Sequence, residues 1–234
     1  MQAAQFQQER ADFRHVEAWI FDLDNTLYRA DSRIFEQIDA RMAAYVARLL
    51  GVDADDARRV QKAYYRDHGT TLNGLMQRHG VDPEEFLAQV HDIDLAALAP
   101  SPALNRAIGA LPGRRFVFTN GCRSHAARVL DRIGLTPHID EIWDIRTTQF
   151  QPKPFPSAYD TVVAQAKLAP ARAAMFDDLR PNLAPARALG MTTVWIDTGS
   201  VWATQGPQAE SGAAHSDHVT RDLSEFLHAI RIGP

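Results

Sequence analysis

The sequence lacks the features of several protein classes. It has one cysteine, Cys122, in 234 residues, so no disulfide can form within the chain. No apolar run approaches the roughly 20 residues of a membrane-spanning helix, and residues 1–14 have no apolar centre of signal-peptide length. Basic residues are not in excess, because 25 Lys and Arg face 29 Asp and Glu, a formal net charge of −4, without a dense Lys/Arg run. We therefore expect a cytoplasmic protein that binds neither membranes nor nucleic acid.

Two patterns of apolar residues occur in the chain, and they alternate regularly after about residue 100. Short apolar runs of strand character alternate with segments of helical periodicity. The expected strands are 18–21, 115–119, 142–145, 173–176 and 192–196, and the expected helices are 103–111, 125–133, 156–168, 183–189 and 223–230. Such alternation predicts an α/β protein with a doubly wound, Rossmann-like parallel sheet. In these folds ligands bind at the carboxyl ends of the strands.

The segment between the first and second expected strands is different. From about residue 31 to 91 apolar residues recur at helical spacing and no convincing strand occurs; examples are Ile34, Ile38, Met42, Tyr45 and Val46. We interpret this segment as an all-helical cap inserted into the core, with the core formed by residues 15–29 and 100–234 and the cap by residues 30–99. Residues 199–217, rich in Gly, Ser and Ala, are expected to form a surface loop.

Polar side chains of four kinds follow the expected strands or precede a helix. They are Asp22 and Asp24 after the first strand, Thr119-Asn120 after the second, Lys153 in the loop before a helix, and the pair Asp177-Asp178 after a later strand. This set meets the needs of phosphoryl transfer. A divalent cation with hard oxygen ligands lets a carboxylate approach an anionic phosphate, fixed donors stabilise the transferring group, and a second acid protonates the leaving alkoxide.

Each part of that chemistry has a candidate in the sequence. Asp22 is the candidate nucleophile, which would form an aspartyl-phosphate, and Asp24 is the candidate acid and then base. The remaining roles are binding roles: Thr119, Asn120 and Lys153 for the phosphate, and Asp22, Asp24, Asp177 and Asp178 for Mg²⁺. Alone, each motif has an ordinary explanation as a turn, a helix cap or a solvated loop residue. Their joint occurrence in this order favours a catalytic site.

These residues also carry a resemblance. The string Phe21-Asp22-Leu23-Asp24-Asn25-Thr26-Leu27 resembles the first motif of the haloacid dehalogenase (HAD) superfamily, and Thr119, Lys153 and Asp177-Asp178 resemble its second, third and fourth motifs. The resemblance implies a Rossmann-like core, a helical cap and Mg²⁺. It further implies that the residue matching Asp178 binds the metal directly, that the one matching Asp177 often acts through water, and that the one matching Asp24 contributes its backbone carbonyl. Dehalogenases of the superfamily lack an acid at the position of Asp24, so a phosphatase is expected.

A finer resemblance points to the pyrimidine 5′-nucleotidase branch. It rests on three strings, residues 24–28, 64–75 and 118–121. It implies hydrolysis of pyrimidine nucleoside 5′-monophosphates such as UMP or CMP, although Leu179 stands where Ser more often follows the acidic pair. The alternatives are a phosphatase for another small phosphate, such as a sugar phosphate, and a non-catalytic module with the same fold.

Several residues are left with two interpretations. In the cap, contact with a base or sugar and internal packing are both open for Tyr64, Tyr65, Arg66, His68 and Asn73. Cys122 has no partner indicated in the sequence and is expected to begin a helix. The expected ligand is a small phosphate ester, and the sequence leaves a monomer and a homodimer equally open.

Overall fold

The computed structural model describes residues 10–199 and 216–233. Its strands are β1 (Asp12–Phe13), β2 (Ala18–Phe21), β3 (Arg114–Phe118), β4 (Glu141–Trp143), β5 (Ala173–Asp177), β6 (Thr192–Ile196), β7 (His218–Thr220) and β8 (Arg231–Ile232). Its α-helices are α1 (Ile34–Leu50), α2 (Ala54–His68), α3 (Thr71–His79), α4 (Pro83–Val90), α5 (Pro102–Gly109), α6 (Arg123–Ile133), α7 (Pro156–Ala166), α8 (Arg180–Ala188) and α9 (Leu223–Ala229). Three short 3₁₀ helices lie at Ala30–Ser32, Thr136–His138 and Pro170–Arg172.

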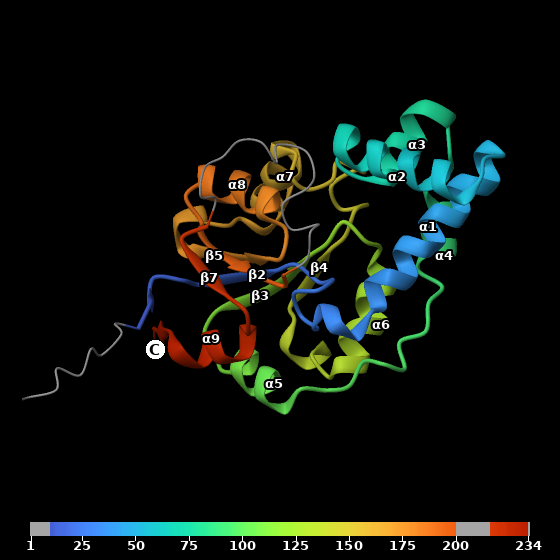
Figure 1. Ribbon diagram of the computed structural model, residues 1–234. Helices are drawn as coiled ribbons and strands as arrows, with labels where there is room; N and C mark the ends of the chain where they lie inside the picture. The colour runs from blue at the N-terminus through green and yellow to red at the C-terminus, as the bar shows by residue number, and fades with distance from the viewer. Residues whose placement is uncertain (1–9, 200–215, 234) are drawn as a thin grey trace, which may run out of the picture.

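The main sheet has six strands in the order β4-β3-β2-β5-β6-β7, and every neighbouring pair is parallel. The chain leaves β2 for β3 and β4 on one side and then crosses to β5, β6 and β7 on the other. The order therefore reverses around β2, which places the switch point of the doubly wound sheet at the end of that strand. The predicted fold class is confirmed, with an all-helical segment inserted after β2 (Figure 1).

Successive side chains of each strand point to opposite faces of the sheet and pack into two apolar layers. In β2, Trp19 and Phe21 pack on one face with residues of α5, α6 and α9, whereas Ile20 packs on the other with residues of α7 and α8. Figure 1 shows α7 and α8 on one side of the sheet and α5 and α9 on the opposite side. Because both faces are covered, the central strands are apolar along their whole length, and polar residues are confined to their ends.

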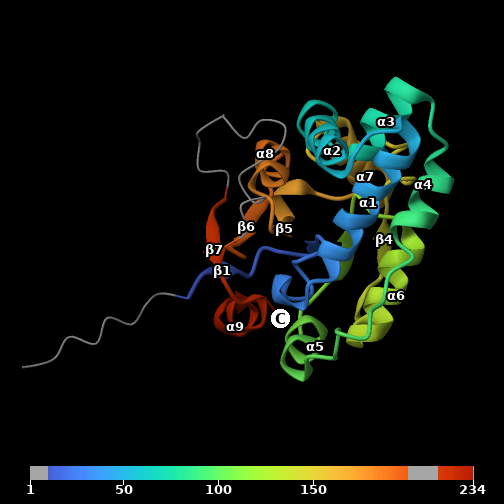
Figure 2. The same ribbon diagram turned by 45° about the vertical axis from the view of Figure 1, so that its right-hand side comes forward.

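The inserted segment is held by its helix ends and by an apolar cluster that also includes Cys122 and Ile145 of the core. Asp53 caps α2 by accepting from the N–H groups of residues 55 and 56, and Gly51 ends α1 with φ of 64°. Tyr45, Leu75 and Phe86 are among the buried residues of its cluster. Figure 2 shows α1 to α4 together beside the sheet. The predicted boundaries of core and cap stay a prediction.

Some short elements were not predicted. Strands β1 and β8 form a separate parallel pair, and β7 adds an edge strand to the main sheet. Of the loop expected at 199–217, residues 200–215 lie outside the described part of the chain, and β7 begins directly after it. Within residues 10–199 and 216–233, no helix has both the length and the apolar character to cross a bilayer.

Candidate active site

The loop after β2 presents two carboxylates at the switch point of the sheet. The N–H of Asp22 donates to the carbonyl of Phe176, so Asp22 extends the β2–β5 ladder by one residue. Asn25 then turns the chain with φ of 62°, in the left-handed region that Asn tolerates better than most residues. This turn gives Asp22 and Asp24 fixed places directly beyond the strand.

Lys153 joins the ends of three strands although it is almost wholly buried, with 1% exposure. Its Nζ lies 2.7 Å from Asp22 Oδ1, 2.7 Å from Asp177 Oδ2 and 2.7 Å from the carbonyl oxygen of Phe118. An ammonium has three donors, and all three are used. Lys153 occupies Oδ1 of Asp22 only, so Oδ2 has no donor among the described residues.

Asn120 fixes the loop that carries Lys153. Its Oδ1 accepts from the Lys153 N–H at 2.8 Å, and its Nδ2 donates to the Lys153 carbonyl at 3.0 Å. The side-chain amide is therefore used up in a structural contact. Thr119 is also buried, and its Oγ1 accepts from the Gly121 N–H at 2.9 Å, which leaves its O–H available as a donor.

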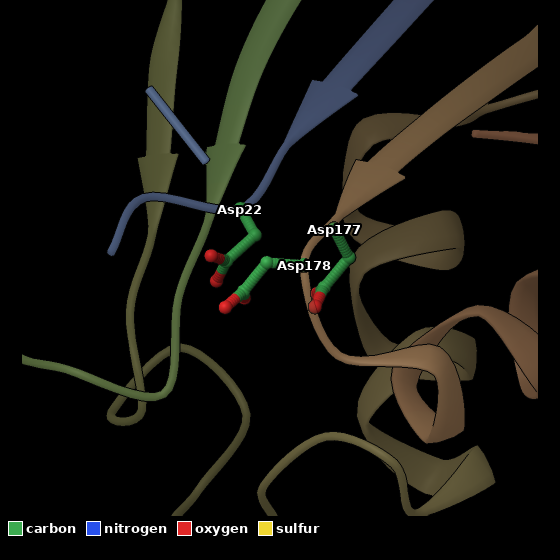
Figure 3. Close-up of side chains that lie close together, drawn as sticks. All are labelled: Asp22, Asp177 and Asp178. Carbon is green, nitrogen blue, oxygen red and sulfur yellow. The ribbon is translucent and has the colours of Figure 1, made fainter. Parts of the chain in front are cut away.

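The two acids after β5 have different surroundings. Asp177 accepts four hydrogen bonds, from Lys153, the Leu179 N–H and, twice, the Asn182 amide. The Asp178 carboxylate has no hydrogen-bond donor among the described residues. Figure 3 shows that Asp22, Asp177 and Asp178 leave the ends of β2 and β5 in the same direction, and ligand atoms of all three lie within 4.8 Å of one another.

Electrostatics indicates that this cluster suits a cation. Burial raises the pKa of Asp22, with further increases from Asp177 and Asp24 that Lys153 opposes. Burial and the neighbouring carboxylates Asp22 and Asp177 also raise the pKa of Asp178. Burial alone would lower the pKa of Lys153, but Asp177 and Asp22 raise it above its ordinary value, so it stays charged. One lysine facing four carboxylates leaves an excess of buried negative charge, and the oxygen donors fit a hard divalent ion.

Asp24 has two donors of its own, both to the same oxygen. His125 Nε2 lies 2.8 Å from Asp24 Oδ1, and the Tyr28 hydroxyl donates to that oxygen at 2.7 Å. Burial would raise the pKa of Asp24, but the contacts with His125 and Tyr28 outweigh it and lower the pKa. Asp24 is thus ionised in this arrangement.

A cavity of about 170 Å³ extends from these residues under the inserted helices. At the sheet it is lined by Asp22, Asp24, Thr119, Asn120, Lys153 and Asp178. Its helical walls are mostly apolar and come from α1 and α4: Phe35, Ile38, Met42, Phe86, Leu87 and Val90. The lining also includes the polar side chains of Asp39, Gln61, Lys62, Tyr65, Thr70, Thr71 and His91.

Comparison with known proteins agrees with this geometry. A family model described as haloacid dehalogenase-like hydrolase matches residues 16–190, well over half of the chain. The chain belongs to the haloacid dehalogenase-like hydrolase family. This HAD-like hydrolase is 26% identical over 189 residues to phosphate metabolism protein 8 of Saccharomyces cerevisiae, an alignment that covers 74% of the chain but only 59% of the yeast protein.

Solved structures share the fold of this HAD-like hydrolase. A HAD phosphatase from Thermococcus onnurineus is 19% identical with a TM-score of 0.58, over 92% of this chain and 100% of that one. The magnesium-bound putative HAD hydrolase YfnB of Bacillus subtilis is 15% identical with a TM-score of 0.57, over 96% and 100%. L-2-haloacid dehalogenase from Xanthobacter autotrophicus is 16% identical with a TM-score of 0.54, over 91% and 97%. Phosphatases and dehalogenases both occur among these structures, so this likeness concerns the fold alone.

The structure of the HAD-like hydrolase brings together all the sequence-predicted site residues, and all but Asp177 line the cavity. The five cap residues for which base contact was left open differ in their positions. Tyr65 lines the cavity, whereas Tyr64 bonds to His79 and packs on Gly74. Neither Arg66, His68 nor Asn73 is among the lining residues: Arg66 pairs with Asp67, Asn73 donates to the His68 carbonyl, and His68 meets the Tyr64 ring edge-on.

Two histidines next to the site were not predicted from the sequence. His125 contacts Asp24, and His91 stacks on His125 with ring centroids 4.5 Å apart. Cys122 precedes α6 as expected, but it does have a partner, because its Sγ lies 3.1 Å from His91 Nδ1. The only available signal was the position of His125 in the first turn of the helix that follows Thr119-Asn120.

Proposed function

We propose that the protein is a Mg²⁺-dependent phosphomonoester hydrolase that works through an aspartyl-phosphate on Asp22. One observation carries this proposal: the buried Lys153 binds Oδ1 of Asp22 and Oδ2 of Asp177, while no residue that the structure describes donates to Oδ2 of Asp22 or to the carboxylate of Asp178. A structural ion-pair network would satisfy its carboxylates. Here the free oxygens lie beside a cavity, where a phosphate and a cation would complete them.

The carboxylates of Asp22 and Asp178 and the backbone carbonyl of Asp24 would hold Mg²⁺, because Asp177 is already saturated by four hydrogen bonds. When bound, the ion neutralises negative charge between phosphate and carboxylate. Asp177 then acts through Lys153, whose ammonium it orients. The Asn120 side chain orients the Lys153 backbone in the same way. Among the described residues the Asn120 backbone N–H has no acceptor, so it can donate to a phosphoryl oxygen beside the Thr119 hydroxyl.

The reaction then follows from the residues. Oδ2 of Asp22 attacks phosphorus, the bond from phosphorus to the leaving oxygen breaks, and Asp24 gives that oxygen a proton. Water next attacks the phosphorus of the aspartyl-phosphate while Asp24 takes up a proton, which releases phosphate and restores Asp22. The phosphate dianion beside Asp24 raises the pKa of that carboxyl, which lets an acid that is ionised in the free protein carry the proton.

Asp24 also separates a phosphatase from a dehalogenase. A halide departs as a stable anion and needs no proton, so a buried second acid has no task in its displacement. An alkoxide needs one. Together with the acidic pair after β5, Asp24 favours phosphate-ester hydrolysis, and the similarity to phosphate metabolism protein 8 is in keeping with it.

For the substrate we propose pyrimidine nucleoside 5′-monophosphates. The walls of the cavity from α1 and α4 are apolar, which suits the face of a planar base, and Asp39, Gln61 and Tyr65 offer polar partners for its edge. A sugar phosphate presents hydroxyls in every direction, and these would lie unpaired against Phe35, Met42 and Phe86.

The substrate proposal is tested by comparing kcat/KM across a panel of phosphate esters. We expect UMP and CMP to be hydrolysed with kcat/KM at least about tenfold above those of hexose and glycerol phosphates, a difference of about 1.4 kcal/mol. Phe86→Ala should lower kcat/KM for UMP more than for glycerol phosphate, while Phe226→Ala, outside the cavity, should change the ratio little. Equal values across the panel would leave a general phosphatase.

The metal proposal is tested by melting. At a Mg²⁺ concentration 100 times its Kd, native-state binding adds about 2.7 kcal/mol, which should raise Tm by about 5 to 10 °C. Asp178→Asn should abolish this rise. Without metal, Asp178→Asn should melt no lower than wild type, because the folded pKa of Asp178 is raised and its ionised form costs stability at neutral pH. A wild-type Tm that does not respond to Mg²⁺ would contradict the assembled site.

A further inference from the structure

His125 lies wholly buried in the first turn of α6 and has one hydrogen-bond partner among the described residues, Asp24. Its Nε2 lies 2.8 Å from Oδ1 of Asp24, an oxygen that also accepts from the Tyr28 hydroxyl, so we assign the hydrogen of this contact to His125 Nε2. The other ring nitrogen, Nδ1, is buried and has no hydrogen-bond partner in the described part of the chain. Burying a ring nitrogen without a partner lowers stability, and a residue kept only for packing would avoid that cost.

The contact acts on a defined oxygen. His125 and the Tyr28 hydroxyl both donate to Oδ1 of Asp24, at 2.8 and 2.7 Å, and no described residue donates to Oδ2. Two donors from different elements, the β2 loop and α6, determine the orientation of the carboxylate plane. The arrangement therefore leaves Oδ2 as the oxygen that can exchange a proton with a ligand in the cavity.

The His125 ring is itself held in place. His91, at the end of α4, stacks on it with an interplanar angle of 8°. Burial, with a further contribution from His125, lowers the pKa of His91 to about 3, so the stacked ring is neutral. Arg128 of α6 donates to the His91 carbonyl at 3.0 Å, and Cys122 lies against His91 Nδ1. Because His91 is held by these contacts, the His125 ring stacked on it can keep one orientation toward Asp24.

We propose that His125 is a positioning residue for Asp24: it holds Oδ1 so that Oδ2 is aligned with the leaving oxygen of the phosphate ester. The inference rests on the proposed function, since it gives Asp24 the task of protonating the leaving group. Its consequence is specific. Losing the contact should slow the step that needs a proton from Asp24 and spare a step that does not.

The test compares two leaving groups in wild type, His125→Leu, His125→Gln and the control His228→Leu, an exposed histidine on α9. For UMP, or the fastest sugar phosphate if UMP is not cleaved, His125→Leu should lower kcat/KM by about 100-fold. For p-nitrophenyl phosphate, whose leaving group departs without a proton, the loss should stay below about threefold. The amide of His125→Gln can donate to Oδ1 and should recover most of the UMP activity.

A double mutant keeps the test independent of folding. In an Asp24→Asn background, His125→Leu should not lower kcat/KM for UMP, or for the sugar phosphate used in its place, any further. The reason is that the Asp24 carboxyl, which His125 positions, is already absent. If His125→Leu does not fold, Tyr28→Phe, which removes the other donor, should show the same leaving-group selectivity to a smaller degree. Equal losses for both substrates, or no loss for either, would overturn the inference. A wild-type protein that cleaves no phosphate ester would instead refute the proposed function.

Discussion

Asp22→Asn should lower kcat for p-nitrophenyl phosphate by at least roughly 10⁴-fold with Mg²⁺ present. The reason is chemical. Oδ2 of Asp22 is the carboxylate oxygen that no described donor occupies, and an amide in its place does not attack phosphorus. The measurement is steady-state release of p-nitrophenolate, with Asp160→Asn, an exposed aspartate on α7, as the matched control that should keep wild-type activity.

The loss in Asp22→Asn should not come from unfolding. The amide oxygen can still accept from Lys153, which also keeps Asp177 and the Phe118 carbonyl. Because burial raises the pKa of Asp22, removing its charge should leave the metal-free Tm unchanged or higher at neutral pH. A folded Asp22→Asn protein that retains more than about a hundredth of the wild-type rate would exclude Asp22 as the nucleophile.

Lys153→Met should destabilise the metal-free protein by about 3 to 5 kcal/mol, as expected when one partner of a buried ion pair is removed. Methionine is similar in length but donates no hydrogen bond, so Asp22 and Asp177 lose their common cation in a buried site. Activity should be lost as well, since the phosphoryl group would meet an uncompensated cluster of carboxylates. The measurement is urea unfolding at pH 7 without Mg²⁺.

The control is Lys167→Met, at an exposed position after α7, which should change stability by no more than about 0.5 kcal/mol. The pH dependence gives a second check. The folded pKa values of Asp22 and Asp178 are raised, so the penalty in Lys153→Met should grow as pH rises from 7 and shrink as pH falls below 7 and these carboxyls take up protons. An unfolding midpoint equal to that of wild type would mean that Lys153 does not hold the cluster together.

The sheet and its acidic edge could be predicted because the signals are local. Apolar runs such as 173–176 and 192–196 give the strands, and the carboxyl ends of parallel strands share one edge of the sheet, so residues far apart in sequence had to meet there. The approach of Asp22 to the pair Asp177-Asp178 follows from that rule, whereas Lys153 reaches them from the loop before α7. The three short strands β1, β7 and β8 carry too few residues for a pattern, and they escaped prediction.

What the sequence did not reveal depends on packing between elements. Helical periodicity indicated an apolar face on α1, but not that Phe35, Met42 and Phe86 line a cavity over the acids. Nor does any spacing relate His91 to His125, which meet only because the chain returns from α4 beside α6. Asn120 illustrates the limit for a single residue, because its amide proved to hold the Lys153 backbone.

The proposed mechanism depends most on Asp22 and Asp178 sharing one ion beside a phosphoryl group bonded to Asp22. The most direct test is a crystal structure of the protein grown with Mg²⁺ and beryllium fluoride, which mimics a phosphoryl group on an aspartate. We predict beryllium bonded to a carboxylate oxygen of Asp22, one Mg²⁺ between Asp22 and Asp178, and Lys153 still joining Asp22 to Asp177. A fluoride complex on any other residue, or an ion that does not contact Asp178, would contradict the account.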